Sequence, residues 1–231
     1  MKNYLIVGGS SGIGASLVEL LYKKGHQVFA TYNTTDPKKI EGVEYHQLDV
    51  TAEGFKLDFL PEQLDGLAYC PGRIKLLPFG RMKHQDILED YEVQTLGAIH
   101  VIQACIPALK AVEQSSVVLY STVAVQQGFN FHAMVASSKG AIEGLTRSLA
   151  AEFAPKIRFN AIAPSITDTP LAARLLSSDQ KKEANAERHP LKRIGSSDDI
   201  AQMTHFLLSE ESSWMTAQII AVDGGMSSIK G

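Results

Sequence analysis

The sequence predicts a single α/β domain of the Rossmann type, a doubly wound sandwich with a mainly parallel sheet of about seven strands. Three observations predict this fold class. Short apolar runs typical of buried strands alternate with amphipathic, helix-like segments along all 231 residues. A glycine-rich segment joins the first strand to the first helix. No internal repeat or low-complexity linker divides the chain, so we expect one domain over residues 1–231.

The first half of the chain holds most of the expected strands, which cover residues 4–7, 26–31, 43–47, 65–70 and 116–121. An amphipathic helix opens at the glycine-rich segment, and Gly25 follows its last turn. A second helix is expected over residues 85–109, where apolar residues recur at helical spacing. The polar stretch 33–42 contains Pro37 and is expected to be a loop.

The second half continues the alternation. We expect a long helix over residues 131–153, ending before Pro155, and then a strand over residues 157–163. The polar segment 169–188 is expected to form two short helices. Ser197 is expected to cap a helix over residues 198–208, and the last strand covers residues 218–222. In such a sheet, ligands bind at the carboxyl ends of the strands, near the switch between its halves.

The composition indicates an ordinary globular protein. Hydrophobic residues make up 45% of the chain, charged residues 20%, and the formal net charge is −3. This charge predicts no attraction to nucleic acid or to an anionic membrane. The apolar runs are too short to span a bilayer, and residues 1–3 lack the pattern of a signal peptide. With only Cys70 and Cys105, no disulfide framework is expected, and a cytoplasmic location is predicted.

The glycine-rich segment after the first strand reads Gly-Gly-Ser-Ser-Gly-Ile-Gly, a Gly-x3-Gly-x-Gly spacing over residues 8–14. Gly8 allows a sharp turn, Gly12 lets the backbone approach a pyrophosphate, and Gly14 lets the helix pack close to the strand. The free N–H groups and the positive end of the helix dipole then face the anion. The segment therefore predicts a dinucleotide site.

The glycine-rich segment and four further motifs resemble the short-chain dehydrogenase/reductase family along nearly the whole chain. The further motifs are Leu48-Asp49-Val50, Ser137-Ser138-Lys139-Gly140-Ala141, the run 158–164 and Val222-Asp223-Gly224-Gly225. The resemblance implies an NAD(P)-dependent oxidoreductase. Such an enzyme transfers hydride between the nicotinamide and a small-molecule carbonyl or alcohol substrate.

The resemblance also implies which residues bind the cofactor. The pyrophosphate segment contributes Gly8, Ser10, Ser11, Gly12, Ile13 and Gly14. In the family, the aspartate that matches Asp49 contacts the adenine, and Val50 stands beside it. Gly72 closes the family motif after the fourth strand.

The nicotinamide half of the cofactor site follows the same resemblance. In the family, the lysine that matches Lys139 bonds the nicotinamide ribose. The segment 164–169 holds the nicotinamide, and from it we select Pro164, Ile166 and Thr169. Ser165 replaces the glycine that usually follows the proline.

The catalytic positions depart from the family pattern. The family uses Tyr-x3-Lys, with a serine thirteen residues before the tyrosine and an asparagine on the preceding helix. Lys139 matches the lysine, but Val135 stands at the tyrosine position. Thr122 takes the serine position and Gln94 the asparagine position. A valine carries no proton, whereas hydride transfer to a carbonyl needs an acid or an oxyanion stabiliser.

Two side chains are candidates for the missing role. Residues 132, 135 and 139 fall on one helix face, which places His132 on the stripe that bears Lys139. Thr122, at the end of the fifth strand, can hold a substrate oxygen. The alternatives are a partly exposed capping histidine and ordinary β-branched packing. We expect the substrate to lie between Thr122, Val135 and the segment 167–190.

Val135 keeps a second function open, that of a catalytically inactive NAD(P)-binding regulatory protein in which binding shifts a conformation read by a partner. A non-redox enzyme that keeps the fold, such as a lyase, is a further alternative. The histidines are scattered along the chain, so no metal site is predicted.

The end of the second strand favours NADP over NAD, although NAD stays possible. Enzymes specific for NAD carry an acidic residue there, but the run Ala-Thr-Tyr-Asn over residues 30–33 holds no carboxylate. Thr31 and Asn33 can bond a 2′-phosphate, and Lys38 or Lys39 can neutralise it.

Small residues recur every four positions along the long helix, at Gly140, Gly144 and Ser148. Such a stripe lets two backbones approach closely. The family commonly assembles through this helix and its predecessor, so we expect a homodimer or homotetramer.

Overall fold

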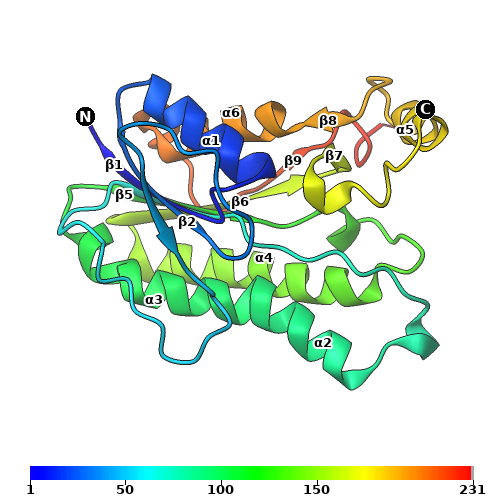
Figure 1. The fold of residues 1–231 in the computed structure, drawn as a ribbon, viewed down its shortest axis with the longest axis horizontal. Coiled ribbons are helices and arrows are strands. Elements are labelled where there is room, and N and C mark those ends of the chain that lie inside the picture. The colour runs from blue at the N-terminus through cyan, green and yellow to red at the C-terminus, as the bar shows by residue number, and fades with distance from the viewer. Residues whose placement is uncertain (230–231) are drawn as a thin grey trace.

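The computed structural model describes residues 1–229 and contains a seven-stranded sheet in which all neighbouring strands are parallel. The strand order is β3-β2-β1-β4-β5-β6-β9 (Figure 1). The strands are β1 (Asn3–Val7), β2 (Gln27–Tyr32), β3 (Glu44–Gln47), β4 (Gly66–Tyr69), β5 (Ser115–Tyr120), β6 (Ile157–Pro164) and β9 (Ile219–Val222). The predicted Rossmann-type fold is confirmed.

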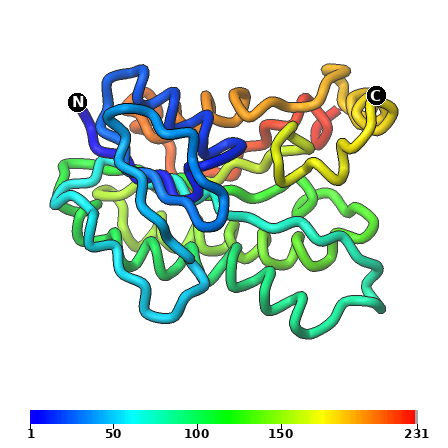
Figure 2. Tube along the Cα trace, viewed as in Figure 1, coloured from blue at the N-terminus to red at the C-terminus, as the bar shows by residue number. Residues whose placement is uncertain are grey.

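Helices cover both faces of the sheet. On one face α1 (Gly12–Lys23) packs against α6 (Ser197–Leu208), and on the other lie α3 (Gly97–Lys110) and α4 (Ala133–Phe153) (Figure 1). The segment between β4 and α2 (His84–Tyr91) and the segment between β6 and α6, which includes α5 (Asp179–Glu187), extend beyond the same end of the sheet (Figure 2). These two segments flank the carboxyl ends of the strands.

The central strands are buried on both faces, which explains their uninterrupted apolar runs. In β1, Leu5 and Val7 join the core that α3 and α4 cover, while Tyr4 and Ile6 join the core that α1 and α6 cover. All four side chains are almost completely buried. Each such side chain contributes about 1.5–3 kcal/mol of burial free energy. The end of β1 is thereby held firmly beneath the glycine-rich turn.

The helix expected over residues 85–109 is interrupted, which corrects the sequence prediction. α2 ends at Tyr91, a wider π-helical turn covers Glu92–Leu96, and α3 begins at Gly97. The wide turn carries Gln94 and Thr95, which are buried and hydrogen-bonded to groups outside the turn. Those bonds compensate for the looser turn. Apolar periodicity could not reveal it, because the interruption is only about one turn long.

The long helix α4 begins at Ala133, two residues later than predicted. The reason is the backbone of Phe131, whose φ of +68° is left-handed and cannot continue a helix. His132 is therefore the residue before the helix and not part of its first turn. The polar segment 169–188 forms one 3-10 turn, Pro170–Ala172, and the helix α5, close to expectation.

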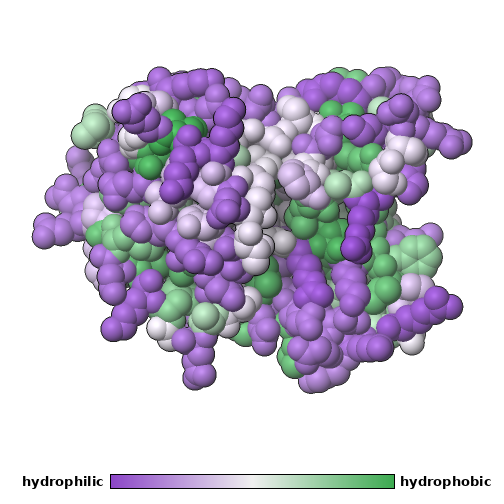
Figure 3. Space-filling model, in the orientation of Figure 1, coloured by the Kyte–Doolittle hydropathy of each residue, from purple (hydrophilic) through white to green (hydrophobic). Residues whose placement is uncertain are grey.

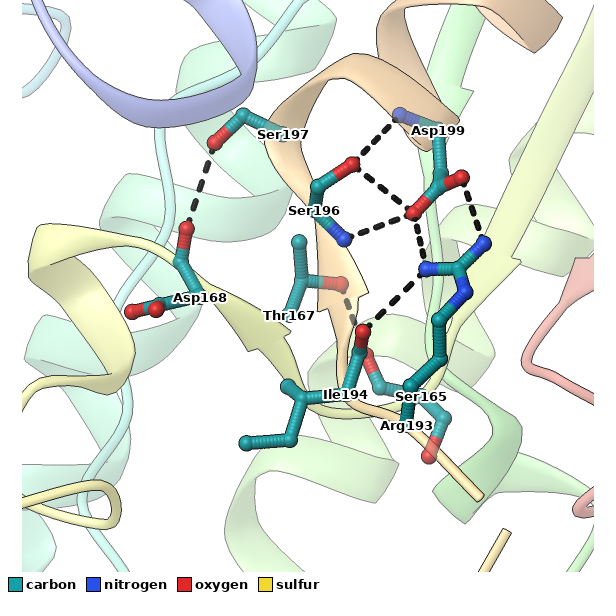
Figure 4. Close-up of polar contacts among 8 residues, drawn as sticks. All are labelled: Ser165, Thr167, Asp168, Arg193, Ile194, Ser196, Ser197 and Asp199. Carbon is teal, nitrogen blue, oxygen red and sulfur yellow. Dashed lines mark hydrogen bonds and ion pairs between the residues drawn. The ribbon is translucent and has the colours of Figure 1, made fainter. Parts of the chain in front are cut away.

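The N-cap of α6 is Ser196 and not Ser197 as predicted (Figure 4). The Ser196 hydroxyl accepts the Asp199 N–H at 3.1 Å, and the Asp199 carboxylate accepts the Ser196 N–H at 2.7 Å. Arg193 donates two further hydrogen bonds to the same carboxylate. This arrangement pins the start of α6 beside a two-stranded ladder, β7 (Thr167–Asp168) and β8 (Gly195–Ser196), which the sequence did not predict.

Within residues 1–229, none of the helices combines the length and the apolar character that crossing a bilayer requires.

The capping geometry predicts different effects for two neighbouring serines. Ser196→Ala should lower the free energy of unfolding by about 1 kcal/mol, because it removes an N-cap hydroxyl. Ser197→Ala should cost less than half as much, because within residues 1–229 the Ser197 hydroxyl makes a single long hydrogen bond, to the Asp168 carbonyl at 3.3 Å. Urea unfolding of both variants measures the difference. Equal losses would show that Ser196 is not the functional cap.

Candidate active site

A cavity of about 650 Å³ opens at the carboxyl ends of the strands. Figure 3 shows an apolar hollow at this end of the molecule, between the two helical layers. Of the residues predicted from the sequence, the cavity is lined by Ile13, Gly72, Gln94, Thr122, His132, Val135, Lys139, Pro164, Ile166 and Thr169. Tertiary structure thus brings together predicted residues from segments that are far apart in the chain.

The glycine-rich turn has the backbone that a pyrophosphate site requires. Gly8 and Gly12 are left-handed, with φ of +76° and +52°. A Cβ at Gly14 would overlap the carbonyl oxygen of Gly8, so only glycine permits this approach of helix to strand. The N-cap Ser11 makes no side-chain capping bond, which leaves first-turn N–H groups for a ligand. The turn therefore fits a dinucleotide cofactor.

The predicted contact of Thr31 with a 2′-phosphate is not supported. Thr31 is buried, and its hydroxyl accepts the Gly8 N–H at 3.2 Å. Its side chain therefore braces the glycine-rich turn from behind. Asn33, just after β2, is exposed. Ser10 and Lys38 line a second cavity of about 310 Å³ beside the turn, whereas Lys39 does not line it.

Asp49 and Val50 follow β3 and lie apart from the main cavity. The Asp49 carboxylate accepts the hydroxyl of Thr51 at 2.7 Å and its N–H at 2.9 Å. These bonds lower the pKa of Asp49, so the group stays ionised. Val50 is buried against Gly97. The fixed, exposed carboxylate suits the predicted adenine contact, which stays a prediction.

Lys139 lies on α4 and is only 8% exposed. Burial lowers the pKa of its ammonium group to about 8, and the nearby Asp90 and Cys70 partly oppose that shift. Among residues 1–229 no side chain or carbonyl accepts a hydrogen bond from Lys139. A buried ammonium facing a cavity without a protein partner fits the predicted bond to the nicotinamide ribose.

Gln94 belongs to a buried polar network that the sequence did not reveal. Its amide donates to the Asp90 carboxylate at 2.8 Å and to the Ser138 hydroxyl at 3.0 Å, and Ser138 donates to the same Asp90 oxygen at 2.6 Å. One Asp90 oxygen and the Gln94 carbonyl oxygen remain buried without a protein partner. The network places one negative charge near Lys139 and offers two acceptors to a water.

Val135 and His132 lie on the wall near Lys139. Val135 is 7% exposed and presents an apolar surface to the cavity. The His132 Nδ1 lies 2.8 Å from the Asn130 carbonyl, which can only accept, so Nδ1 carries the hydrogen and Nε2 is the acceptor in the neutral ring. The role of His132 as the acid stays a prediction.

Thr122 follows β5 and reaches the cavity with a loosely held hydroxyl. Its oxygen accepts the Ala124 N–H at 3.3 Å, and its hydrogen points to the Pro164 carbonyl at 3.5 Å. The second contact is long enough to be exchanged for a better acceptor. Thr122 can therefore donate to a substrate oxygen, as the sequence predicts.

Ser165 and His189 are two polar cavity residues that were not selected as site residues from the sequence, although Ser165 was noted there as a departure from the family's glycine. The His189 ring is buried, with Nδ1 2.7 Å from the Asn185 carbonyl and Nε2 2.8 Å from the Ser165 hydroxyl. His189 was one of several scattered histidines. The one available signal was the serine at position 165, where the family has glycine.

Cys70 also lines the cavity, but burial raises the pKa of its thiol to about 12. It stays protonated at neutral pH and is a poor nucleophile. Both cysteines are free, so no disulfide joins them.

Comparison with known proteins places this geometry in a family. The family model described as enoyl-(acyl carrier protein) reductase matches residues 7–227. The 3-oxoacyl-[acyl-carrier-protein] reductase of Thermotoga maritima is 31% identical over 245 residues, covering 97% of each chain. A short-chain dehydrogenase family protein from Francisella tularensis superposes with a TM-score of 0.90, at 27% identity, over 99% of this chain and 100% of its own.

The chain belongs to the short-chain dehydrogenase/reductase family. It is an NAD(P)-dependent oxidoreductase, as the resemblance implied. The structure of ElxO with NADP bound superposes with a TM-score of 0.89 at 26% identity, over 99% of this chain and 100% of its own. No comparison supports the inactive regulatory alternative.

The buried Lys139 predicts a pH dependence of stability. Its folded pKa of about 8 lies below the ordinary 10.5. Between these values the unfolded chain binds more protons, so the free energy of unfolding should rise with pH, by at most about 3 kcal/mol. Lys139→Met should remove this rise, whereas Lys156→Met, which changes an exposed lysine, should keep it. Urea unfolding from pH 7.5 to 10.5 measures the difference, and parallel curves for all three proteins would contradict it.

Proposed function

We propose that this oxidoreductase uses NADP(H) and acts on a small carbonyl or alcohol compound with an apolar body. The observation that carries the proposal is the convergence of Lys139, Thr122 and the glycine-rich turn on one apolar cavity. A cavity of about 650 Å³ is the size of an ordinary ligand site and has room for the nicotinamide and a small substrate.

Each residue has a chemical task in this proposal. The nicotinamide supplies or accepts the hydride. Lys139 donates to its ribose and contributes positive charge, while Pro164, Ile166 and Thr169 border the ring. Thr122 donates a hydrogen bond to the substrate oxygen and stabilises the charge that develops there. Gln94 supports Lys139 through the Asp90 network.

A substrate screen tests the proposal, with NADPH oxidation and NADP reduction followed across ketones, aldehydes, alcohols and quinones. On the best substrate, Thr122→Ala should lower kcat about 100-fold, because one oxyanion donor is lost. NADPH affinity should stay within threefold, and Thr122→Ser should restore most of the rate. If the unmodified protein binds NADPH tightly and turns over none of these classes, the regulatory function becomes the better proposal.

The preference for NADP rests on charge. No carboxylate stands at the end of β2 to repel a 2′-phosphate, and Lys38 shares the second cavity with Ser10 of the glycine-rich turn. The structural relative ElxO, which was solved with NADP, supports the same choice. Asn33, exposed beside the end of β2, is a further donor for the phosphate.

Lys38→Ala should weaken NADPH binding about tenfold, because one charge-assisted contact to phosphate is worth about 1.5 kcal/mol. NADH binding should not change. Lys39→Ala is the matched control, since Lys39 does not line the cavity. Fluorescence titration of both coenzymes gives the four affinities. A tenfold preference of the unmodified protein for NADH would refute the assignment.

We also propose that the chain forms a symmetric homodimer or homotetramer in the cytoplasm. Gly144 and Ser148 of the small-residue stripe lie exposed on the outer face of α4, and a Cβ at Gly144 would meet open space. A second copy of α4 can therefore approach this face closely. The reduced cysteines agree with a cytoplasmic location.

A further inference from the structure

The cavity contains a hydrogen-bonded serine–histidine pair in addition to Lys139 and Thr122. Ser165 follows β6, and His189 follows α5, so two different elements supply the pair. Both residues line the cavity, and His189 is 3% exposed. Val135 leaves this cavity without the phenol that its family uses. The pair therefore lies in the same space as the position that lacks a proton donor.

The hydrogen bonds of His189 determine which member of the pair donates and which accepts. The Asn185 carbonyl accepts only, so the His189 Nδ1, at 2.7 Å, must carry a hydrogen. In the neutral ring Nε2 is then an acceptor, and the Ser165 hydroxyl donates to it at 2.8 Å. A hydroxyl that donates to an imidazole, itself oriented by a third group, is the arrangement that activates serines in enzymes.

Ser165 lies directly beside the proposed anchor of the substrate oxygen. The residue before it, Pro164, offers its carbonyl to the Thr122 hydroxyl at 3.5 Å. The backbone of Ser165 is held on both sides, since its N–H donates to the Val222 carbonyl and its carbonyl accepts the Thr167 hydroxyl at 3.0 Å (Figure 4). Its hydroxyl is held by His189 Nε2 and belongs to a residue that lines the same cavity as Thr122.

The charges around His189 come from three directions. Asp223, after β9, faces it, and although burial alone raises the pKa of that carboxyl, bonds from Ser227 and Gly225 and the charge of His189 lower it overall. Arg188 stands beside it in the chain but turns its guanidinium over the Phe129 ring. Lys139 lies across the same cavity. The ionised Asp223 can stabilise a protonated imidazole.

The geometry points to Ser165 and His189 as the proton relay of this enzyme, in place of the missing tyrosine. In alcohol oxidation, with a bound oxidised nicotinamide to take the hydride, the substrate would give its hydroxyl proton to the Ser165 oxygen, which would pass its own proton to His189 Nε2. The C–H and O–H bonds break, the C=O bond forms, and the nicotinamide is reduced. Carbonyl reduction runs these transfers in reverse, from a protonated His189. The inference rests on the proposed oxidoreductase function.

The competing explanation is that the pair only ties α5 to β6. A second hydrogen bond that anchors the segment after β6 provides a matched comparison. In this bond the Ser197 hydroxyl donates to the Asp168 carbonyl (Figure 4). Ser197 does not line the cavity. Ser197→Ala therefore removes a hydroxyl anchor of the same segment without touching the proposed relay.

The kinetic test compares four variants on the best substrate. Ser165→Ala and His189→Asn should each lower kcat about 100-fold, with NADPH affinity within threefold. Ser165→Thr should recover at least tenfold over Ser165→Ala, and Ser197→Ala should stay within twofold of the unmodified enzyme. His189→Asn should also abolish the pH dependence of kcat for reduction that the unmodified enzyme and Ser197→Ala share.

Nuclear magnetic resonance gives a readout without turnover. With 15N-labelled histidine at alkaline pH, the neutral His189 ring should carry its hydrogen on Nδ1, and Ser165→Ala should shift the Nε2 signal. A hydrogen on Nε2 would overturn the relay, because that nitrogen could not then accept the serine proton.

The outcomes distinguish a failure of the proton relay from a failure of the proposed oxidoreductase function. If the unmodified protein turns over no substrate, the oxidoreductase proposal and the relay both fail. If it is active and Ser165→Ala keeps more than a third of kcat, or loses NADPH affinity to the same extent as kcat, only the relay fails. A 100-fold loss in His132→Ala without one in Ser165→Ala would assign the proton to His132 instead.

Discussion

The close approach of two backbone segments at the end of β1 is the constraint on which the site depends. Gly14 at the start of α1 lies against the carbonyl of Gly8 with no space for a side chain. The buried hydroxyl of Thr31 supports the same turn from β2. Because β1 lies beside β4, where the strand order reverses, this turn directs the start of α1 to the crevice between the two halves of the sheet. Gly12 also faces Thr169, so the pyrophosphate and nicotinamide segments meet there.

The cavity next to this turn contains a buried charge, that of Lys139, within mainly apolar walls. Lys139 loses most of its hydration on α4, and the network of Asp90, Gln94 and Ser138 returns part of that stabilisation through charge and hydrogen bonds. The π-helical turn makes this possible, since it turns the Gln94 amide toward Asp90. The pKa of the buried Lys139 is thereby kept at about 8, so the ammonium group stays mainly charged at neutral pH.

Replacing a phenol by Val135 removes a proton donor but not the other parts of the chemistry. The ribose contact, the oxygen anchor at Thr122 and the nicotinamide segment remain in one cavity. The hydrogen-bonded hydroxyl of Ser165 and imidazole of His189, which follow β6 and α5, lie in that cavity as well. Proton transfer depends on the position of an acid and not on its place in the chain, so a family member can move it between elements.

The sequence by itself determined the order of strands and helices, the glycine-rich turn and the family. These features depend on apolar periodicity and on backbone conformation within short stretches of residues. It also singled out Lys139 and Thr122, whose spacing follows a motif. Only the tertiary structure decided that Thr31 braces the turn, that Gln94 sits in a π-helical turn, that His132 precedes α4, and that His189 meets Ser165. Each of these depends on a partner far along the chain or on a single left-handed residue such as Phe131. No local pattern encodes such a contact, since it forms only when the sheet brings the ends of separate strands together.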